Sequence, residues 1–180
     1  MCNVYLDITF RQKQTKFSNL VFRFIIRKRK QTPPNINALV LVPISKQGGV
    51  FLLPGCCDPF NEKALRASRG ASFQIPIVCG RWIHLEALTN KYQMRILAAQ
   101  PENSEELKPA SLLSQGLADS LTDTKMCLVL GSEGSGLSEK TKEVCELVSI
   151  PMVGEFESLN VSVAGGIFLY MLQVENHRFT

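Results

Sequence analysis

Short apolar runs alternate along residues 49–173 with longer stretches whose apolar residues recur at helical spacing. Apolar runs bounded by turn residues predict buried strands, and we expect them at 49–54, 73–78, 94–99, 125–130 and 146–152. Helices are expected at 58–71, at 83–92, after Ser138 and from 158 to 173. This alternation predicts an α/β fold, in which a mostly parallel sheet carries helices on both faces.

Turn and capping residues indicate where these helices begin and end. Asp58 or Asn61 can cap the first helix, and Gly70 stops it. Ser158 is the expected N-cap of the last helix. The stretch 101–115 is a polar connection that we expect to be partly helical.

The first 48 residues do not follow this order. The run NALVLVPI (37–44) has the composition of a strand, although Pro43 weakens that prediction. Only the segment SKQGG separates it from the strand at 49–54. Because a parallel crossover needs about a dozen residues or more, the two runs form a hairpin at best or stay unpaired. We therefore expect an irregular or incomplete N-terminal part that lacks the first helix of the sheet.

Composition and charge describe an ordinary globular chain with one basic arm. The 180 residues are 45% apolar and 20% charged, which fits a single domain with a sizeable core. Residues 1–34 carry eight Lys or Arg and one acidic residue, whereas residues 35–180 carry twelve basic and fifteen acidic residues. The arm is compatible with targeting to a mitochondrion or chloroplast, and equally with an RNA-gripping tail. The globular part has no general basic surface.

The cysteine and histidine patterns argue against a metal site. The six cysteines form no C-x-x-C pair, and we expect buried thiols of a reducing compartment. His84 and His177 lack metal-ligand spacing and are predicted to be surface or satisfied histidines. The longest apolar run, VSVAGGIFLYML, is too short to cross a bilayer, and no secretory signal peptide opens the sequence. We expect a soluble intracellular protein that binds no metal and no membrane.

The segment LVLGSEGSGLS (128–138) is an apolar run that ends in glycines before a serine able to cap a helix. Backbone N–H groups gather at such turns, which often bind phosphate. In a P-loop, however, a lysine would stand at the position of Leu137. Gly131, Gly134 and Gly136 run G-x-x-G-x-G instead of the dinucleotide-binding order G-x-G-x-x-G, and they come too late to open such a domain. The turn therefore needs another ligand.

Together with SIPMVGEFESLNVSVAGGIFLYM (149–171), this segment resembles the second and third signature motifs of the SpoU (TrmH) branch of the SPOUT RNA methyltransferases. The stretch from GVFLLP to FQIPIV is similar to the preceding part of the family, so the resemblance covers residues 49–174. It implies a C-terminal trefoil knot, a rare exception among folds, that binds S-adenosyl-L-methionine. It further implies methylation of a ribose 2′-hydroxyl in tRNA or rRNA by a homodimer with its active site near the subunit interface.

The resemblance implies that Gly131, Ile150 and Leu159 contact the cofactor. S-adenosylmethionine carries no phosphate, so its site needs exposed backbone and apolar walls instead of a P-loop lysine. A glycine at position 131 lets the main chain approach the ligand without a Cβ. Ile150 and Leu159 supply apolar walls against the adenine and the methionine chain.

Glu133, Ser158 and Asn160 match the polar functional positions of the family, and we expect them to position the ribose hydroxyl. Ser158 has a second, compatible role as helix cap. Glu133 lies beside a positive helix end, which favours a carboxylate even without a function. Asn160, in the first turn of an apolar helix, is harder to explain by packing.

Two other pairs of residues have both a functional and a plain interpretation. Gly165 and Gly166 lie inside the last helix, where each costs roughly 1 kcal/mol relative to alanine. With Ser162 they form a small-residue face that suits a threaded knot, a dimer contact or internal packing. Arg66 and Arg69 share one side of the first helix, where they either bind RNA phosphates or form a solvated face.

One motif of the family is missing. Its first motif, N-x-G-x-x-x-R, occurs nowhere in this chain, and by resemblance its arginine helps to activate the ribose hydroxyl, a weak nucleophile. The motif would precede GGVFLLP, where the crossover helix is also missing. We therefore hypothesise that residues 1–48 are a divergent basic segment that replaces the family's N-terminal half-domain, as an alternative exon or a faulty gene model would. Residues 49–180 would then form a partial SpoU-type domain.

The expected function is S-adenosylmethionine-dependent RNA ribose 2′-O-methylation, impaired by the missing arginine. Arg23 or Arg27 of the arm would replace that arginine only by accident. The alternative is a non-catalytic RNA-binding or dimer-partner SPOUT domain. A dinucleotide-binding oxidoreductase is a more distant alternative.

Overall fold

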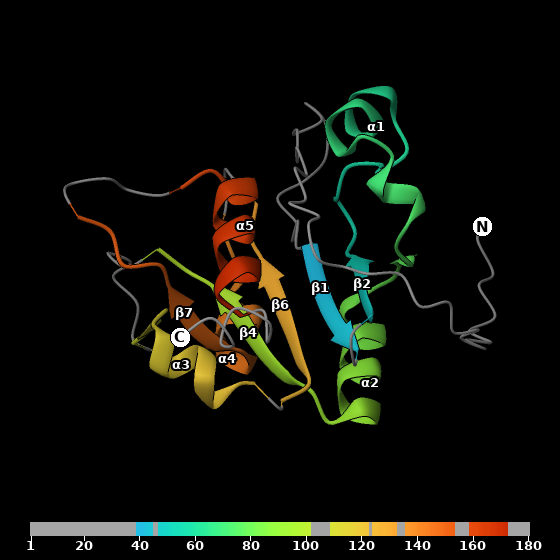
Figure 1. Cartoon of the computed structure of the whole chain (residues 1–180). Helices are drawn as coiled ribbons and strands as arrows, with labels where there is room; N and C mark the ends of the chain where they lie inside the picture. Colours follow the sequence, from blue (N-terminus) through green and yellow to red (C-terminus); the bar gives the residue numbers. More distant parts are fainter. Residues whose placement is uncertain are drawn as a thin grey trace.

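The computed structural model describes residues 39–44, 47–101, 109–122, 124–132, 136–153 and 159–172. These residues contain one sheet with the strand order β3-β2-β1-β6-β4-β7-β5 (Figure 1). The strands are β1 (Leu39–Ile44), β2 (Gln47–Leu52), β3 (Ile77–Cys79), β4 (Arg95–Ala99), β5 (Ser111–Leu112), β6 (Met126–Leu130) and β7 (Glu146–Ser149). The helices are α1 (Glu62–Ser68), the 3₁₀ turn η1 (Ala71–Phe73), α2 (Trp82–Tyr92), α3 (Gln115–Ser120), α4 (Glu139–Val144) and α5 (Val161–Met171).

One strand runs against the rest of the sheet. β1 is antiparallel to both of its neighbours, β2 and β6, whereas the other neighbouring strands pair in parallel. The blue arrow of β1 points opposite to the arrows of β2 and β6 in Figure 1. β1 and β2 form a hairpin whose register pairs Ile44 with Gln47. Of the two alternatives that the short SKQGG segment allows, a hairpin or no pairing, the structure has the hairpin, and it leaves β2 parallel to β6.

Pro43 is tolerated in β1 because of where the pairing ends. β6 pairs only with residues 39–41 of β1, whereas β2 pairs along all of β1. Pro43 pairs with Gly48 and therefore lies beyond the part of β1 that has two neighbours. A proline has no N–H to donate and is accepted where a strand has a free edge.

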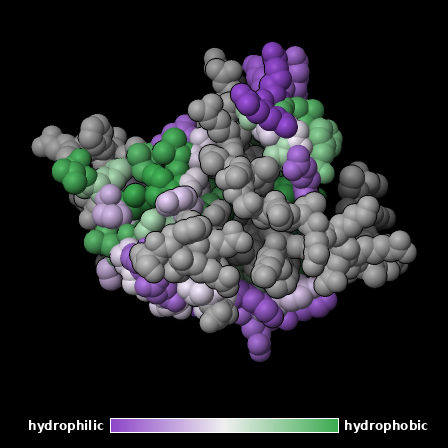
Figure 2. Space-filling model, viewed as in Figure 1, coloured by the Kyte–Doolittle hydropathy of each residue, from purple (hydrophilic) through white to green (hydrophobic). Residues whose placement is uncertain are grey.

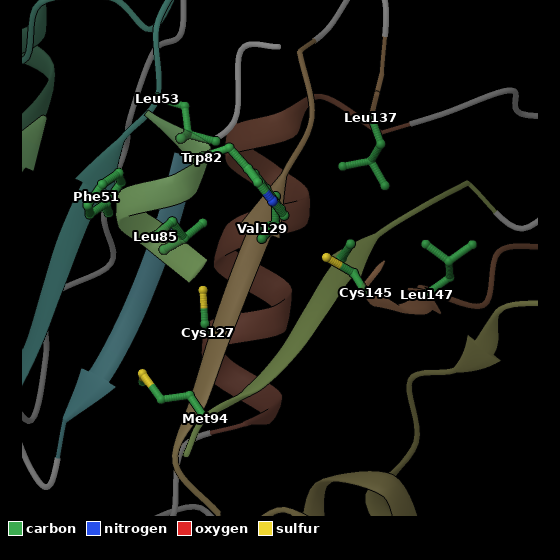
Figure 3. Close-up of a cluster of buried hydrophobic side chains, with 11 residues drawn as sticks. Phe51, Leu53, Trp82, Leu85, Met94, Cys127, Val129, Leu137, Cys145 and Leu147 are labelled. Atoms are coloured by element: carbon green, nitrogen blue, oxygen red, sulfur yellow. The ribbon is translucent and has the colours of Figure 1, made fainter. Parts of the chain in front are cut away.

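Helices cover both faces of the sheet, as the alternating pattern predicts. On one face, α2 packs on β2 and β6 in a core that includes Phe51, Trp82, Leu85, Val129 and Leu147 (Figure 3). On the other face, α5 packs in a second core around Leu97, Leu128, Val148, Val161 and Phe168. All five residues of β6 are buried, since this strand lies between the two cores.

The predicted helix ends are confirmed at α1. The Oδ1 atom of Asn61 accepts hydrogen bonds from the backbone N–H groups of Lys63 and Ala64, both at 3.0 Å. Asn61, and not Asp58, is therefore the N-cap. The helix ends at Arg69 and Gly70, whose φ values of 48° and 82° lie in the left-handed region.

Several sequence predictions need correction. The strand expected at 73–78 begins only at Ile77, because Phe73 belongs to η1 and Pro76 has no N–H for a ladder. β5 and most of α3 were not predicted: β5 has two exposed residues, and α3 contains Gly116 and no apolar period. The last helix starts at Val161 with Asn160 as its N-cap, so Ser158 is not the cap.

The cysteines are less uniform than predicted. Cys127 and Cys145 are buried, as expected, but Cys79 is exposed and Cys56 and Cys57 are half-buried. Cys79 ends the short edge strand β3, and composition alone could not predict that its side chain would be exposed there. Within the described ranges, no group of three or more His, Cys, Asp or Glu gathers as a metal site would, and no helix is long and apolar enough to span a bilayer.

Candidate functional site

The residues predicted to bind the cofactor gather at one edge of the sheet. Gly131 directly follows β6, and Ile150 directly follows β7. Both strands pair in parallel with β4 between them, so the two residues lie at the same carboxyl edge, about 10 Å apart by strand spacing. α5 begins at this edge and runs back along the sheet (Figure 1). Leu159 and Asn160 therefore enter at the same edge, the usual ligand-binding edge of an open α/β sheet.

Gly131 is required by the shape of its own turn. The backbone of Ser132 exchanges two hydrogen bonds with that of Gly136, at 3.1 and 3.0 Å. A Cβ on Gly131 would lie 2.5 Å from the carbonyl carbon of Gly136 and 2.8 Å from the backbone nitrogen of Leu137. The two limbs of the turn thus touch at this glycine. The structure therefore shows that Gly131 lies close to the backbone of Gly136 and Leu137. Contact of Gly131 with the cofactor stays a prediction.

The turn is anchored in the core by Leu137. Its side chain is buried with Trp82 and Leu147 (Figure 3). A P-loop lysine would have to point toward a phosphate from this position, so the burial of Leu137 agrees with the rejection of that motif. Gly136 has a φ of 62°, a conformation that glycine adopts without strain.

Ile150 and Leu159 provide apolar surface that the fold covers only in part. Ile150 is half-buried and packs against the second core, and Leu159 is 37% exposed. Apolar atoms in such a position can be covered further by a bound ligand. These two residues and the turn after Gly131 are brought to one edge, as the resemblance implies.

Asn160 has a structural role that the sequence did not reveal. Its Oδ1 atom accepts hydrogen bonds from the backbone N–H of Ser162 at 2.9 Å and from the hydroxyl of the same residue at 2.6 Å. This is the helix cap that was assigned to Ser158. Packing therefore does explain an asparagine at this position. A role of Asn160 in positioning the ribose hydroxyl stays a prediction. The same role of Glu133 and Ser158 also stays a prediction, and both residues lie outside the described residues.

Ser149 is a polar residue at this edge that the sequence analysis missed. It ends β7, is fully buried, and its Oγ atom has no hydrogen-bond partner among the residues that the structure describes. Leaving a buried hydroxyl unpaired costs about 1–3 kcal/mol. The signal was present in the sequence, since ELVSIPM puts a serine inside an otherwise apolar run directly before Ile150.

The remaining predicted residues have plain environments. His84 is exposed and its Nδ1 accepts the backbone N–H of Arg81 at 3.2 Å, so it is a satisfied surface histidine as predicted. His177, Arg23 and Arg27 lie outside the described residues. A Cβ on Gly165 would come 2.8 Å from Leu130, which shows close packing of α5 on β6.

Comparison with known proteins decides the family. The model of the SpoU rRNA methylase family matches residues 25–170. This chain belongs to that family. The matched range begins before residue 49, and the division of the chain into 1–48 and 49–180 stays a prediction.

Individual relatives agree with the family. The chain is 38% identical over 112 residues to the 23S rRNA (guanosine-2′-O-)-methyltransferase RlmB of Escherichia coli, covering 61% of this chain and 42% of RlmB. It is 35% identical over 131 residues to an uncharacterized tRNA/rRNA methyltransferase of Archaeoglobus fulgidus, covering 72% of this chain and 54% of the relative. The chain thus spans about half the length of these curated relatives.

Solved structures show the same SpoU fold. The AdoMet-bound rRNA methyltransferase of Sinorhizobium meliloti matches with a TM-score of 0.55 and 25% identity, over 73% of this chain and 47% of the other. AviRb of Streptomyces viridochromogenes, a SpoU methyltransferase solved with AdoMet, matches in fold with a TM-score of 0.58 and 22% identity, over 71% and 49% of the two chains. The trefoil knot stays a prediction, and residues 133–135 and 154–158 of the two signature segments lie outside the described residues.

Proposed function

We propose that this chain is an S-adenosylmethionine-dependent RNA ribose 2′-O-methyltransferase domain whose transfer step is impaired. Support for the cofactor comes from the edge of the sheet, which carries the closed turn at Gly131 and the partly covered side chains of Ile150 and Leu159. These residues fit a ligand that has an apolar part and no phosphate. Relatives whose names state S-adenosylmethionine binding and RNA methylation support the assignment.

Several residues at this edge are available to hold the ligand. The segment 150–153 is half-buried or exposed, so its backbone can pair with a heterocycle, and the buried hydroxyl of Ser149, which has no partner among the described residues, lies directly before it. When bound, S-adenosylmethionine supplies a methyl group activated by its positively charged sulfur. The carboxamide of Asn160, fixed at the start of α5, can orient a neutral ribose hydroxyl toward this edge.

The direction of β1 supports the impairment. By resemblance, the family's arginine motif follows the first strand, and its arginine acts on the ribose hydroxyl, which our proposal places at the edge that binds the cofactor. Here β1 is reversed, so its carboxyl end at Ile44 lies at the opposite edge from Gly131. The chain enters β1 at Leu39, which pairs with Leu130 beside Gly131. An arginine placed after β1 in this chain would therefore lie on the wrong side of the sheet, and the hydroxyl would lose its activating group.

The same observation favours a second candidate function, a non-catalytic RNA-binding or dimer-partner domain. Two measurements on the full chain separate the candidates. Calorimetric titration measures S-adenosylmethionine binding, and transfer of a radiolabelled methyl group to bulk tRNA and rRNA measures activity. Digestion of the product to nucleosides shows whether the label is on the 2′-oxygen. Binding with slow 2′-O transfer supports the proposal, binding without transfer supports the second candidate, and no binding refutes the proposal.

A pair of variants makes the binding test specific. Leu159→Asp puts a charge at the proposed ligand wall, whereas Val163→Asp puts the same charge on the exposed side of α5, where Val163 is 50% exposed. We expect Leu159→Asp to abolish cofactor binding because a carboxylate must be desolvated there. Val163→Asp should bind as the wild type does. Equal affinities of the two variants would contradict the placement of the site.

A further inference from the structure

Two exposed aromatic rings form a pair beside α1. Phe60 precedes the helix and Phe73 follows it in η1, and their ring centroids lie 5.6 Å apart with an interplanar angle of 39°. Phe60 is 47% exposed and Phe73 is 71% exposed. Burial in this fold therefore does not explain why both positions are aromatic.

The local structure holds the two rings in place. The Oδ1 atom of Asp58 accepts the backbone N–H of Phe60 at 2.9 Å, and the backbone N–H of Phe73 donates to the carbonyl of Gly70 at 3.1 Å. The hydroxyl of buried Ser72 bonds to that of Ser68 at 3.2 Å and ties η1 to the end of α1. The pair is thus organised before any partner binds.

Three cations lie in the sequence between the two rings. Lys63, Arg66 and Arg69 are exposed on or at the end of α1. Arg66 pairs with Glu62 at 2.8 Å, whereas Lys63 and Arg69 have no acidic partner among the residues that the structure describes. Figure 2 shows strongly hydrophilic residues next to a hydrophobic patch at the top of the molecule, where α1 lies in Figure 1. Exposed π-faces flanked by unpaired cations are the features with which proteins bind single-stranded nucleic acid.

The pair lies at the same edge of the sheet as the candidate cofactor site. α1 follows the carboxyl end of β2, which runs in the same direction as β6 and is separated from it only by β1. Figure 1 shows α1 above that edge. An RNA chain bound at Gly131 can therefore continue toward α1.

We infer that Phe60 and Phe73 form a stacking platform for an unpaired RNA base, while Lys63 and Arg69 bind the adjoining phosphates. The inference rests on the proposed function, because it assumes RNA as the substrate, and it adds the place and the form in which RNA is held. A duplex would not fit, because its bases are already stacked on one another.

The test uses the full chain and fluorescence anisotropy with a fluorescein-labelled single-stranded RNA and with the blunt duplex of the same sequence. Phe60→Leu/Phe73→Leu keeps apolar side chains but removes the rings, and we expect single-strand affinity to fall by roughly 5- to 150-fold with little change for the duplex. Ile83→Leu, at a residue that is 60% exposed on α2, is the apolar control and should bind as the wild type does.

The phosphate contacts have their own readout. Lys63→Gln and Arg69→Gln should each reduce the slope of log affinity against log salt by about 0.7, the value for one phosphate of a single strand. Lys125→Gln makes the same charge change at the start of β6, on the opposite edge, and should leave the slope unchanged. Urea unfolding of every variant checks that the fold is kept.

The outcomes separate this inference from the proposed function. If the wild type binds RNA and the double leucine variant binds it equally, the platform is refuted while the proposed function stands. If the wild type binds no RNA, both are refuted. If the leucine variant changes the molar mass by light scattering and leaves RNA affinity unchanged, the rings belong to a protein contact and the inference is wrong.

Discussion

Replacing Gly131 with alanine tests whether the turn after β6 is closed as the structure shows. The new Cβ would lie 2.5 Å and 2.7 Å from the carbonyl carbon and oxygen of Gly136, and 2.8 Å from the nitrogen of Leu137. These are backbone atoms, so they cannot swing away as the end of a side chain can. The limbs must separate, and the two hydrogen bonds between Ser132 and Gly136 are lost. At about 0.5–1.5 kcal/mol each, their loss lowers the free energy of unfolding by about 1–3 kcal/mol.

Urea unfolding followed by circular dichroism measures this change, and calorimetry measures cofactor binding at the altered turn. Gly116→Ala is the matched control, because Gly116 is exposed on α3 and nothing lies within 4 Å of its added Cβ. That variant should be as stable as the wild type or more stable by up to about 1 kcal/mol. We expect Gly131→Ala to be less stable and to bind S-adenosylmethionine more weakly. Wild-type stability in Gly131→Ala would refute the steric argument.

Three further predictions follow from single environments. Asn160→Ala should lower the free energy of unfolding by about 1 kcal/mol, because α5 loses its cap, and Asn160→Ser should restore that stability. If the amide also orients the ribose, methyl transfer stays low in both variants. Recovery of transfer in the serine variant would mean that capping is the whole role of Asn160. The added Cβ of Gly166→Ala meets no atom within 4 Å, so this variant should stabilise α5 by about 1 kcal/mol. Gly165→Ala forces Leu130 to move and should destabilise the protein by about 1–3 kcal/mol, and thermal unfolding measures both changes. Loss of a dimer in Gly166→Ala would instead place that face of α5 at an interface. Burial, together with the neighbouring Cys145, raises the pKa of the Cys127 thiol above its usual range. Because the folded state resists deprotonation of this thiol, its contribution to stability is complete below the usual pKa of 9.0 and falls as the pH rises above that value. The urea midpoint of Cys127→Ala should therefore fall less steeply from pH 7 to 10 than that of the wild type. Parallel plots of midpoint against pH for the two proteins would contradict this.

The sequence predicted those parts of the fold whose signals are local and redundant. The strands β2, β4, β6 and β7 are apolar runs between turn residues, and they were found within a few positions. Loop length excluded a parallel crossover between β1 and β2 and left a hairpin or no pairing, and the structure has the hairpin. β5 was missed because its two exposed residues carry no apolar pattern, and its pairing with β7 is a tertiary effect.

The candidate site was predicted in a different way. Gly131, Ile150 and Leu159 were identified by motif, and the parallel strands then place them at one edge. What the motif could not supply is the physical reason for each residue. Asn160 caps a helix, and Gly131 makes room for the opposite limb of its own turn, neither of which spacing reveals. Ser149 was overlooked because ELVSIPM was interpreted only as an apolar strand, and only the structure shows that its serine is buried without a partner among the described residues.

The central claim is that the carboxyl edge of this sheet binds S-adenosylmethionine. Amide hydrogen exchange of the full chain, with and without the ligand at saturation, tests it most directly. We predict slower exchange at Gly131, Ser132, Ile150 and Leu159, and unchanged exchange at the hairpin end around Gln47. Unchanged exchange at all four residues, or protection confined to the opposite edge, would contradict the claim.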